Sequence, residues 1–436
     1  MSMSFHRLAL ALASGVLFST ASAAPFAPFD PRAAGMGGTG VASAKTASAA
    51  LFNPAMLSAQ VEGDRFQVAL GLGAQVADED EMVDQLDNLQ TTLDELDRLI
   101  ATIDTSNIFV NTSNADLARI GEETTTLSGQ FTQIDGDSAN VIPAAGLAIG
   151  IAGKKIGVGV FASLNGQLSI STTVDRYDTD RLNLLGTILE DGIVDSAELN
   201  NSSVVDTNGV PQPLFNTASQ TVVDFSDFNS ASSATAVGVA IVEVGVALSR
   251  QYTLANGGLL SAGVTPKSVD VITYEYTANT ESFEDADIED FEATDSGFDL
   301  DIGAVYKTSA DAPWQFGAVA KNLIGGNYKT IAGRKIDVDM QLRAGVARMT
   351  KRTTLAVDLD LTENTGTTGT DATQFLAFGA EYDLKFLQLR AGYRANLAGG
   401  DVADVMTAGL GLGPVDLTAV VSDNTLGAYL NLGFGW

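Results

Sequence analysis

The residues that could carry chemistry in this chain are carboxylates rather than nucleophiles or metal-binding side chains. Its 436 residues include 54 Asp and Glu, no Cys and one His, which is His6. Without Cys there is no thiolate chemistry, and His6 alone would have to serve any Ser-His-Asp triad or His metal site. Catalysis by paired carboxylates or by a Ser-Lys pair needs a spacing that the sequence does not show. We therefore expect no enzyme, no cofactor and no metal ion.

One glycine motif resembles a nucleotide-binding fingerprint. Gly35, Gly37 and Gly40 match the pattern G-x-G-x-x-G. A dinucleotide site also needs a strand before these glycines, a helix after them and an acidic residue about 20 positions later. No strand precedes Gly35, so the small residues more plausibly allow backbone to pack closely inside a narrow space.

Residues 1–23 have the features of a secretory signal peptide. Arg7 supplies a positive charge, Leu8–Phe18 is apolar, and Ala21-Ser22-Ala23 is a small-x-small cleavage site. The apolar stretch is too short to span a bilayer as a helix. Cleavage after Ala23 would remove His6 and deliver the chain across the inner membrane.

Most of the remaining chain alternates between apolar and polar residues. Phe66–Val76, Ile156–Leu164 and Leu387–Tyr393 show this period of two, which indicates strands with one apolar face. The polar faces carry both signs of charge, and many segments reach the roughly 9–11 residues of a tilted transmembrane strand. The last segment, Ala428–Trp436, ends on an aromatic residue.

The connections between these segments alternate between short and long. Short turns and long outer loops are typical of outer-membrane barrels. We predict an all-β transmembrane antiparallel barrel of about 14 strands over residues 63–436. Its long outer loops are expected at 78–138, 175–232 and 280–295, and the N-terminal segment 24–62 is expected to form a hatch in its lumen. The hatch residues are expected to be Gly35, Gly37, Gly38, Gly40, Asn53, Pro54 and Ala55.

Charged residues on the polar faces are candidates for lining the lumen. Their alternatives are a role in permeation and simple cross-strand pairing that stiffens the wall. The candidates are Asp337, Asp339, Arg343, Asp358, Asp360, Glu381, Arg390 and Arg394. Glycines such as Gly157 and Gly303 on the same faces would leave space in the lumen.

One strand changes phase. In Ala234–Leu248 the apolar positions shift by one residue at Ile241 and Val242. A β-bulge there would restore the alternation. It is either a routine bulge or a kink that opens a lateral gap in the wall.

The first long loop has helical periodicity. Apolar residues recur at heptad spacing over 82–103 and again over 117–134. We predict an antiparallel helical hairpin inserted at 78–138, with strongly acidic outer faces. These faces are either a solvated surface or a docking surface. The candidate docking residues are Leu86, Leu93, Leu117 and Leu127.

A second acidic run lies in the loop at 280–295. Calcium favours such oxygen-rich segments, but the spacing of an EF-hand loop is missing. Solvated acid is the favoured interpretation, and weak cation binding is the alternative. The formal net charge of −30 also disfavours direct contact with nucleic acid.

The sequence resembles two related groups of proteins. Asp30-Pro31-Arg32-Ala33, Gly37-Gly38-Thr39-Gly40-Val41-Ala42 and Asn53-Pro54-Ala55 resemble the start of FadL-type outer-membrane proteins. The chain is similar over nearly its whole length to the conjugal-transfer TraF-type outer-membrane proteins, a FadL-like family distinct from the thioredoxin-like TraF. The segments that carry this similarity are Asp84–Gln90, Leu93–Leu96, Gly263–Lys267, Tyr274–Tyr276, Gly303–Lys307 and Val319–Leu323.

The resemblance implies a hatch that plugs a 14-stranded barrel, and a role in plasmid transfer. We expect a non-enzymatic passive channel for hydrophobic small molecules in the outer membrane of a Gram-negative bacterium. The alternative is a surface or assembly component of a conjugative-transfer or secretion apparatus that acts through the acidic hairpin. The expected partners are outer-membrane lipid, a hydrophobic ligand and proteins of that apparatus.

Overall fold

The computed structural model describes most of the chain after its first 29 residues. The described ranges are 30–59, 65–78, 81–101, 114–206, 208–218, 221–222, 232–279, 288–364, 372–399 and 402–436. The expected signal peptide and much of the acidic run near 280 lie outside these residues. Within them, no helix is both long and apolar enough to cross a membrane.

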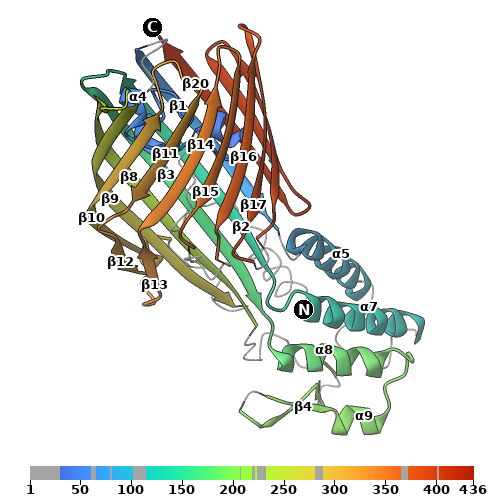
Figure 1. The fold of residues 1–436 in the computed structure, drawn as a ribbon. Helices are drawn as coiled ribbons and strands as arrows, with labels where there is room; N and C mark the ends of the chain where they lie inside the picture. The colour runs from blue at the N-terminus through green and yellow to red at the C-terminus, as the bar shows by residue number, and fades with distance from the viewer. Residues whose placement is uncertain are drawn as a thin grey trace.

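Fourteen antiparallel strands form a closed barrel, as the alternation predicted (Figure 1). The ring closes where β1 pairs with β20, and the rings of Phe66 and Trp436 pack there with centroids 4.7 Å apart. The strands are β1 Phe66–Ala77, β2 Ser138–Ile151, β3 Gly157–Thr173, β8 Ser233–Thr253, β9 Leu259–Asn279, β10 Glu292–Lys307, β11 Trp314–Lys321, β14 Gln341–Met349, β15 Thr353–Asp360, β16 Phe375–Asp383, β17 Leu387–Asn396, β18 Val405–Leu412, β19 Val415–Val421 and β20 Thr425–Gly435.

The outer face of the barrel is apolar and exposed. In β18 buried and exposed residues alternate without interruption, and Met406 and Leu412 are 69% and 50% exposed. Leu70 and Leu72 on β1 behave in the same way, with 53% and 62% exposed. A continuous apolar outer surface of this kind suits hydrocarbon rather than water.

The two ends of the barrel differ. The end that carries the C-terminus and the short connections, such as Gly413–Pro414, is here called the turn end, and the opposite one the loop end. At the loop end, which is at the bottom of Figure 1, β8 and β9 extend beyond the shorter strands. Each has 21 residues, whereas β19 has 7. This taller wall supports additional structure on both its faces.

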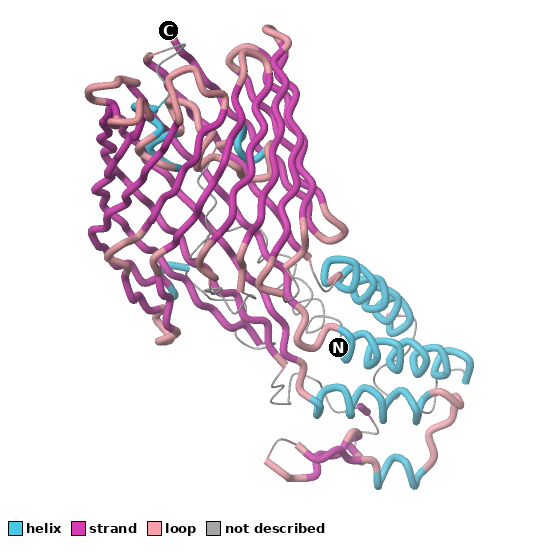
Figure 2. The backbone as a smooth tube through the Cα atoms, in the orientation of Figure 1, coloured by secondary structure: helices cyan, strands magenta, loops and turns pink. Residues whose placement is uncertain are grey.

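A helical layer extends from the loop end of the barrel, next to the ends of β2 and β3. It consists of α5 (Met82–Ile100) and α7 (Asn114–Gln133) from the first long loop, with α8 (Arg176–Leu189) and α9 (Ser196–Asn201) from the second (Figure 2). Leu168 and Ile170 of β3 belong to the same apolar cluster as the helices. The predicted helical hairpin is therefore present, but it extends into a layer that the sequence pattern did not show.

The predicted docking leucines face the interior of this layer. Leu93, Leu117 and Leu127 are each at most 2% exposed, and Leu86 packs against the same cluster. Their heptad spacing reflects burial against α8 and the barrel wall. The expectation that these four side chains contact a partner is wrong.

A hairpin of β12 (Gly326–Lys329) and β13 (Lys335–Val338) covers the inner face of the tall wall. Ile336 and Val338 pack in one cluster with Val239, Val269 and Val271 of β8 and β9. Asp337 and Asp339 point away from that cluster and are exposed, on a hairpin that is not part of the barrel sheet. The expectation that these two aspartates lie on a strand of the barrel wall is therefore wrong.

The same hairpin explains the change of phase in β8. The register of β8 with β3 is continuous, so no residue is inserted at Ile241 or Val242, and the predicted bulge is wrong. Val239 and Ile241 face inward toward the hairpin, whereas Val244 and Val246 face outward and are exposed. The apolar residues of β8 thus face inward where the β12–β13 hairpin covers the strand, and outward where the strand forms the apolar outer surface of the barrel.

We predict that Ile336→Ala loosens the β12–β13 hairpin. Ile336 is fully buried, and such truncations cost about 2–5 kcal/mol. Limited proteolysis of the purified protein should cleave faster within 323–334. The matched control is Ile331→Ala, because Ile331 lies on the same hairpin and is 54% exposed. Equal cleavage rates in the two variants would contradict the packing described.

Candidate functional site

A segment of the chain near its N-terminus lies inside the barrel toward the turn end. It comprises residues 30–59, with the short helices α2 (Pro31–Ala34), α3 (Ala49–Phe52) and α4 (Met56–Ala59) (Figures 1 and 2). Of its side chains, Lys45 is the exposed one. We call residues 30–59 the luminal segment; it contains all seven of the expected hatch residues.

The start of the luminal segment is held by local structure. The carboxylate of Asp30 accepts a hydrogen bond from the backbone N–H of Arg32 at 2.9 Å, and Pro31 occupies the first turn of α2. Gly37 and Gly38 follow with φ of 71° and 86°, a region that glycine enters without strain. These two glycines therefore reverse the direction of the chain inside the barrel, and they do not form a nucleotide-binding loop.

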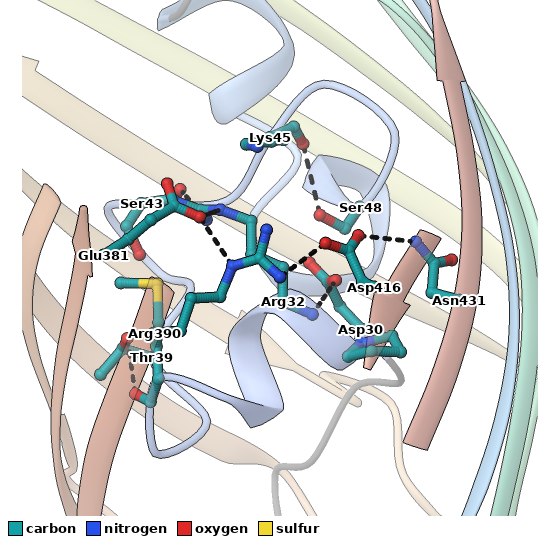
Figure 3. Close-up of polar contacts among 12 residues, drawn as sticks. Asp30, Arg32, Thr39, Ser43, Lys45, Ser48, Glu381, Arg390, Asp416 and Asn431 are labelled. Carbon is teal, nitrogen blue, oxygen red and sulfur yellow. Dashed lines mark hydrogen bonds and ion pairs between the residues drawn. The ribbon is translucent and has the colours of Figure 1, made fainter. Parts of the chain in front are cut away.

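An ion-paired cluster joins the luminal segment to the wall (Figure 3). Arg32 donates from Nε and from its second terminal nitrogen to the two carboxylate oxygens of Glu381, at 2.8 and 2.9 Å. Arg390 donates to Glu381 at 2.8 Å and to Asp416 at 2.6 Å. One carboxylate on β16 therefore serves two arginines, one from the segment and one from β17.

The ion-paired cluster is almost completely withdrawn from water. The side chains of Arg32, Glu381 and Arg390 are 3%, 8% and 1% exposed. Burial alone would lower the pKa of Arg32, but its pairing with Glu381 outweighs that effect and raises the pKa. A buried ion that loses its partner is strongly destabilising, so the segment and the wall depend on each other.

A second carboxylate of the wall holds the glycine turn. Asp358 on β15 accepts hydrogen bonds from the backbone N–H groups of Gly40 and Val41 at 2.7 and 2.9 Å. Two successive N–H groups directed at one oxygen form a small anion-binding concavity. The G-x-x-G spacing here binds a carboxylate of the protein's own wall.

Asn53 fixes the other end of the segment. Its amide donates to the carbonyl oxygens of Val41 and Ala304 at 2.9 and 3.2 Å, and its carbonyl accepts from the N–H of Ala55 at 3.1 Å. It thus ties the segment both to itself and to β10. Pro54 and Ala55 lie at the same contact, against Gly263 of β9.

Glycines line the wall wherever the segment approaches it. A Cβ on Gly392 would lie 2.1 Å from the backbone nitrogen of Gly37, and one on Gly303 would lie 2.0 Å from the side chain of Asn53. Gly157 and Gly317 contact Leu57 and Val41 in the same way. The space that Gly157 and Gly303 were expected to leave in the lumen is thus occupied by the luminal segment.

The other charged residues expected in the lumen face inward. Arg343 and Asp360 form a cross-strand ion pair with one contact of 2.9 Å, and the guanidinium of Arg394 lies 4.4 Å from the ring centroid of Phe375. Simple pairing therefore accounts for Arg343 and Asp360. Asp358, Glu381 and Arg390 additionally hold the segment.

A further ionic cluster was not foreseen. Lys267 on β9 is fully buried and donates to Glu243 and Asn322 at 2.6 and 2.7 Å, with Asp301 at 3.0 Å. It lies along β9 between Gly263, which contacts the luminal segment, and the cluster of the β12–β13 hairpin. The sequence signal of this cluster is Glu243, an acid that interrupts the apolar run from Ala236 to Leu248.

A pocket remains at the turn end beside the luminal segment. It has a volume of about 450 Å³ and lies between that segment and strands β1, β19 and β20. Arg32 and Asp416 border it, and Lys45 opens into it. The ammonium of Lys45 makes no hydrogen bond or ion pair with any residue of the described ranges, and Figure 3 draws it without a carboxylate partner.

Comparison with known proteins identifies one family model and several solved structures. The model described as "F plasmid transfer operon, TraF, protein" (TraF_2) matches residues 50–360. No curated protein sequence matches the chain. TM-scores below 0.5 do not establish a common fold alone, and the architecture described above stands on this chain's own strand pairing. One similar structure is a TodX deltaS2S3 mutant monoaromatic hydrocarbon channel, with 11% identity, a TM-score of 0.47, and coverage of 94% of this chain and 99% of that chain. The Ralstonia pickettii toluene transporter TbuX has 12% identity, a TM-score of 0.43, and coverage of 94% and 97%. A Pseudomonas aeruginosa FadL homologue has 10% identity, a TM-score of 0.42, and coverage of 95% and 98%.

We predict that Glu381→Gln releases the luminal segment. The substitution leaves Arg32 and Arg390 buried without their shared charge, which costs about 3–5 kcal/mol in comparable cases. Protease cleavage within 30–59 should accelerate, and the unfolding temperature should fall. Glu95→Gln is the matched control, because Glu95 also bridges two arginines, Arg98 and Arg119, but at the exposed surface. A similar response of both variants would show that burial of the cluster is unimportant.

We predict that a thiol introduced at the pocket reacts faster than a thiol introduced at a buried position nearby. The natural chain has no Cys, so a single introduced thiol reports its own surroundings. Lys45→Cys should react with a hydrophilic maleimide in the folded protein, whereas Ser43→Cys, at a fully buried position two residues away, should react at least tenfold more slowly. The labelled fraction is measured by mass spectrometry before and after denaturation. Equal rates would mean that no accessible pocket exists at Lys45.

Proposed function

The chain belongs to the family described as the F plasmid transfer operon TraF protein, and from that starting point we propose that it is a passive channel for hydrophobic small molecules in the outer membrane of a Gram-negative bacterium. The channel acts without enzymatic chemistry. The single observation that carries the proposal is the luminal segment, which lies inside the barrel and packs against the wall largely through apolar side chains.

The character of the lumen supports a hydrophobic permeant. Much of the contact between the luminal segment and the wall is apolar and involves side chains such as Val41, Leu57 and Phe161. An aqueous porin keeps a water-filled lumen instead. A solute that passes along an apolar seam avoids the desolvation cost that a polar solute would meet there.

The outer surface supports the location. Apolar side chains cover the strands on the outside, and large aromatic residues stand exposed near the turn end, among them Trp314, Phe386 and Trp436. Aromatic residues at the membrane–water boundary are a feature of outer-membrane barrels. The expected signal peptide at 1–23 is consistent with export to that membrane.

A second function is favoured by one specific feature, the helical layer at the loop end. It has a core of its own and is not needed to close the barrel. Its exposed faces carry acids such as Asp84, Asp87 and Asp94. A component of a conjugative-transfer or secretion apparatus could be contacted through this surface, with charge rather than the buried leucines as the means of recognition.

We predict that tethering the luminal segment to the wall stops uptake reversibly. A Cβ at position 159 would lie 3.0 Å from that of Ala50, so Ala50→Cys with Gly159→Cys needs only a small shift to reach the roughly 3.5–4.5 Å of a disulfide. Cells that carry the double variant in their outer membrane should take up the hydrophobic dye N-phenylnaphthylamine slowly. Dithiothreitol should restore the rate of the natural chain.

Each single-Cys variant is a control, because it carries one of the two substitutions and cannot form the disulfide. The single variants should take up dye at one rate with and without reductant. Dye uptake that is the same in cells with and without the natural protein would contradict the channel. Uptake that continues through the oxidised double variant would contradict movement of the segment.

A further inference from the structure

The pocket at the turn end lies where the luminal segment and the wall are not in close contact. Around β3, β9, β10, β11, β14, β16 and β17, glycines allow the segment to touch the wall directly. Along β20 and β1 the pocket separates them instead, and Gln67 reaches across to accept a hydrogen bond from the N–H of Ala47 at 3.2 Å. Its volume of about 450 Å³ is within the range of about 300–1,000 Å³ that small-molecule sites occupy.

Lys45 is the one basic group of this pocket that lacks a counter-ion within the described residues. Arg32, the other base that lines it, is bound to Glu381. The two acids of the pocket are already engaged, since Asp416 accepts from Arg390 and Asn431, and Asp30 caps α2. The ammonium of Lys45 is therefore the basic group of the pocket that is left to contact a ligand.

The surroundings of Lys45 increase what an anion would gain there. Although the side chain opens into the pocket, the barrel encloses it, and this desolvation lowers the pKa of Lys45. The nearby guanidinium of Arg32 acts in the same direction, while Glu381 and Asp416 act against it. An oxyanion placed against the ammonium would supply the counter-charge that these neighbours do not.

Neighbouring groups can complete the recognition of an oxygen. The amide NH₂ of Gln67 makes no hydrogen bond within the described residues, because only the oxygen of this side chain is engaged. The hydroxyl of Ser48 lies at the same edge of the pocket, where it contacts the carbonyl of Lys45 at 3.5 Å. Ala47 and Ala69 give the pocket a small apolar side.

We propose that the pocket between the luminal segment and strands β1, β19 and β20 is a binding site for a small solute with one oxyanion group, and that Lys45 selects the negative charge. Gln67 is the second donor to the oxyanion, and the alanines contact a small organic body. Binding at this site does not depend on whether the barrel conducts hydrophobic molecules.

The test uses benzoate as the probe and benzyl alcohol as its neutral counterpart. The full-length protein in detergent is dialysed against radiolabelled benzoate, and bound and free ligand are measured at equilibrium. Lys45→Gln should weaken benzoate binding at least tenfold, which corresponds to about 1.4 kcal/mol. Benzyl alcohol should bind the natural chain and Lys45→Gln equally. Lys351→Gln is the matched control, because Lys351 is exposed in a connection at the same end but does not border the pocket.

Each result separates the possibilities. Saturable benzoate binding that Lys45→Gln weakens and Lys351→Gln leaves unchanged supports the site. No binding to the natural chain, or equal loss in both variants, overturns it. The side chain of Lys45 makes no hydrogen bond or ion pair within the described residues, and circular dichroism checks that the variant is intact. Because the measurement involves no transport, it can fail while dye uptake succeeds, or succeed while dye uptake fails.

Discussion

A carboxylate withdrawn from water must be matched by positive charge, and the arrangement inside this barrel follows from how Glu381 meets that requirement. Its two oxygens are shared between Arg32 of the luminal segment and Arg390 of the neighbouring strand. Without it Arg32 would lose the acid it is paired with, and Arg390 would keep only Asp416. The interaction therefore joins the first part of the chain to a strand more than three hundred residues later, and it places α2 against β18, β19 and β20.

The rest of the segment follows from that attachment. Once α2 is fixed, Gly37 and Gly38 turn the chain so that the N–H groups of Gly40 and Val41 reach Asp358. Asn53 then closes the segment against β10. Glycines on the wall make these approaches possible, because any side chain at Gly392 or Gly303 would occupy the space of the segment. The segment is therefore held by a few buried polar attachments together with many close contacts to glycines of the wall.

The tall wall at the loop end shows the same dependence on neighbours. Its outer face packs against helices and its inner face against the β12–β13 hairpin, so both faces of β8 become apolar at different heights. Closer to the turn end, the outer face of β8 is apolar and exposed, as a lipid-facing surface would be. The inner face there carries Glu243, which is paired with Lys267. The strand is regular throughout, and only the identity of what covers each face changes.

The sequence by itself determined the elements and their two faces, because strand and helix periods are properties of neighbouring residues. From Phe66–Val76 and similar segments it predicted a barrel of about 14 strands, from 82–103 and 117–134 it predicted helices, and from Gly35–Gly40 a closely packed turn. Only the tertiary structure decided which distant surfaces meet. It gave Arg32 its partner Glu381, placed Leu93 and Leu127 in a core, assigned Asp337 and Asp339 to a hairpin rather than to a barrel strand, and filled the space beside Gly157 and Gly303. Each of these depends on contacts between residues far apart in the chain, which no local period records.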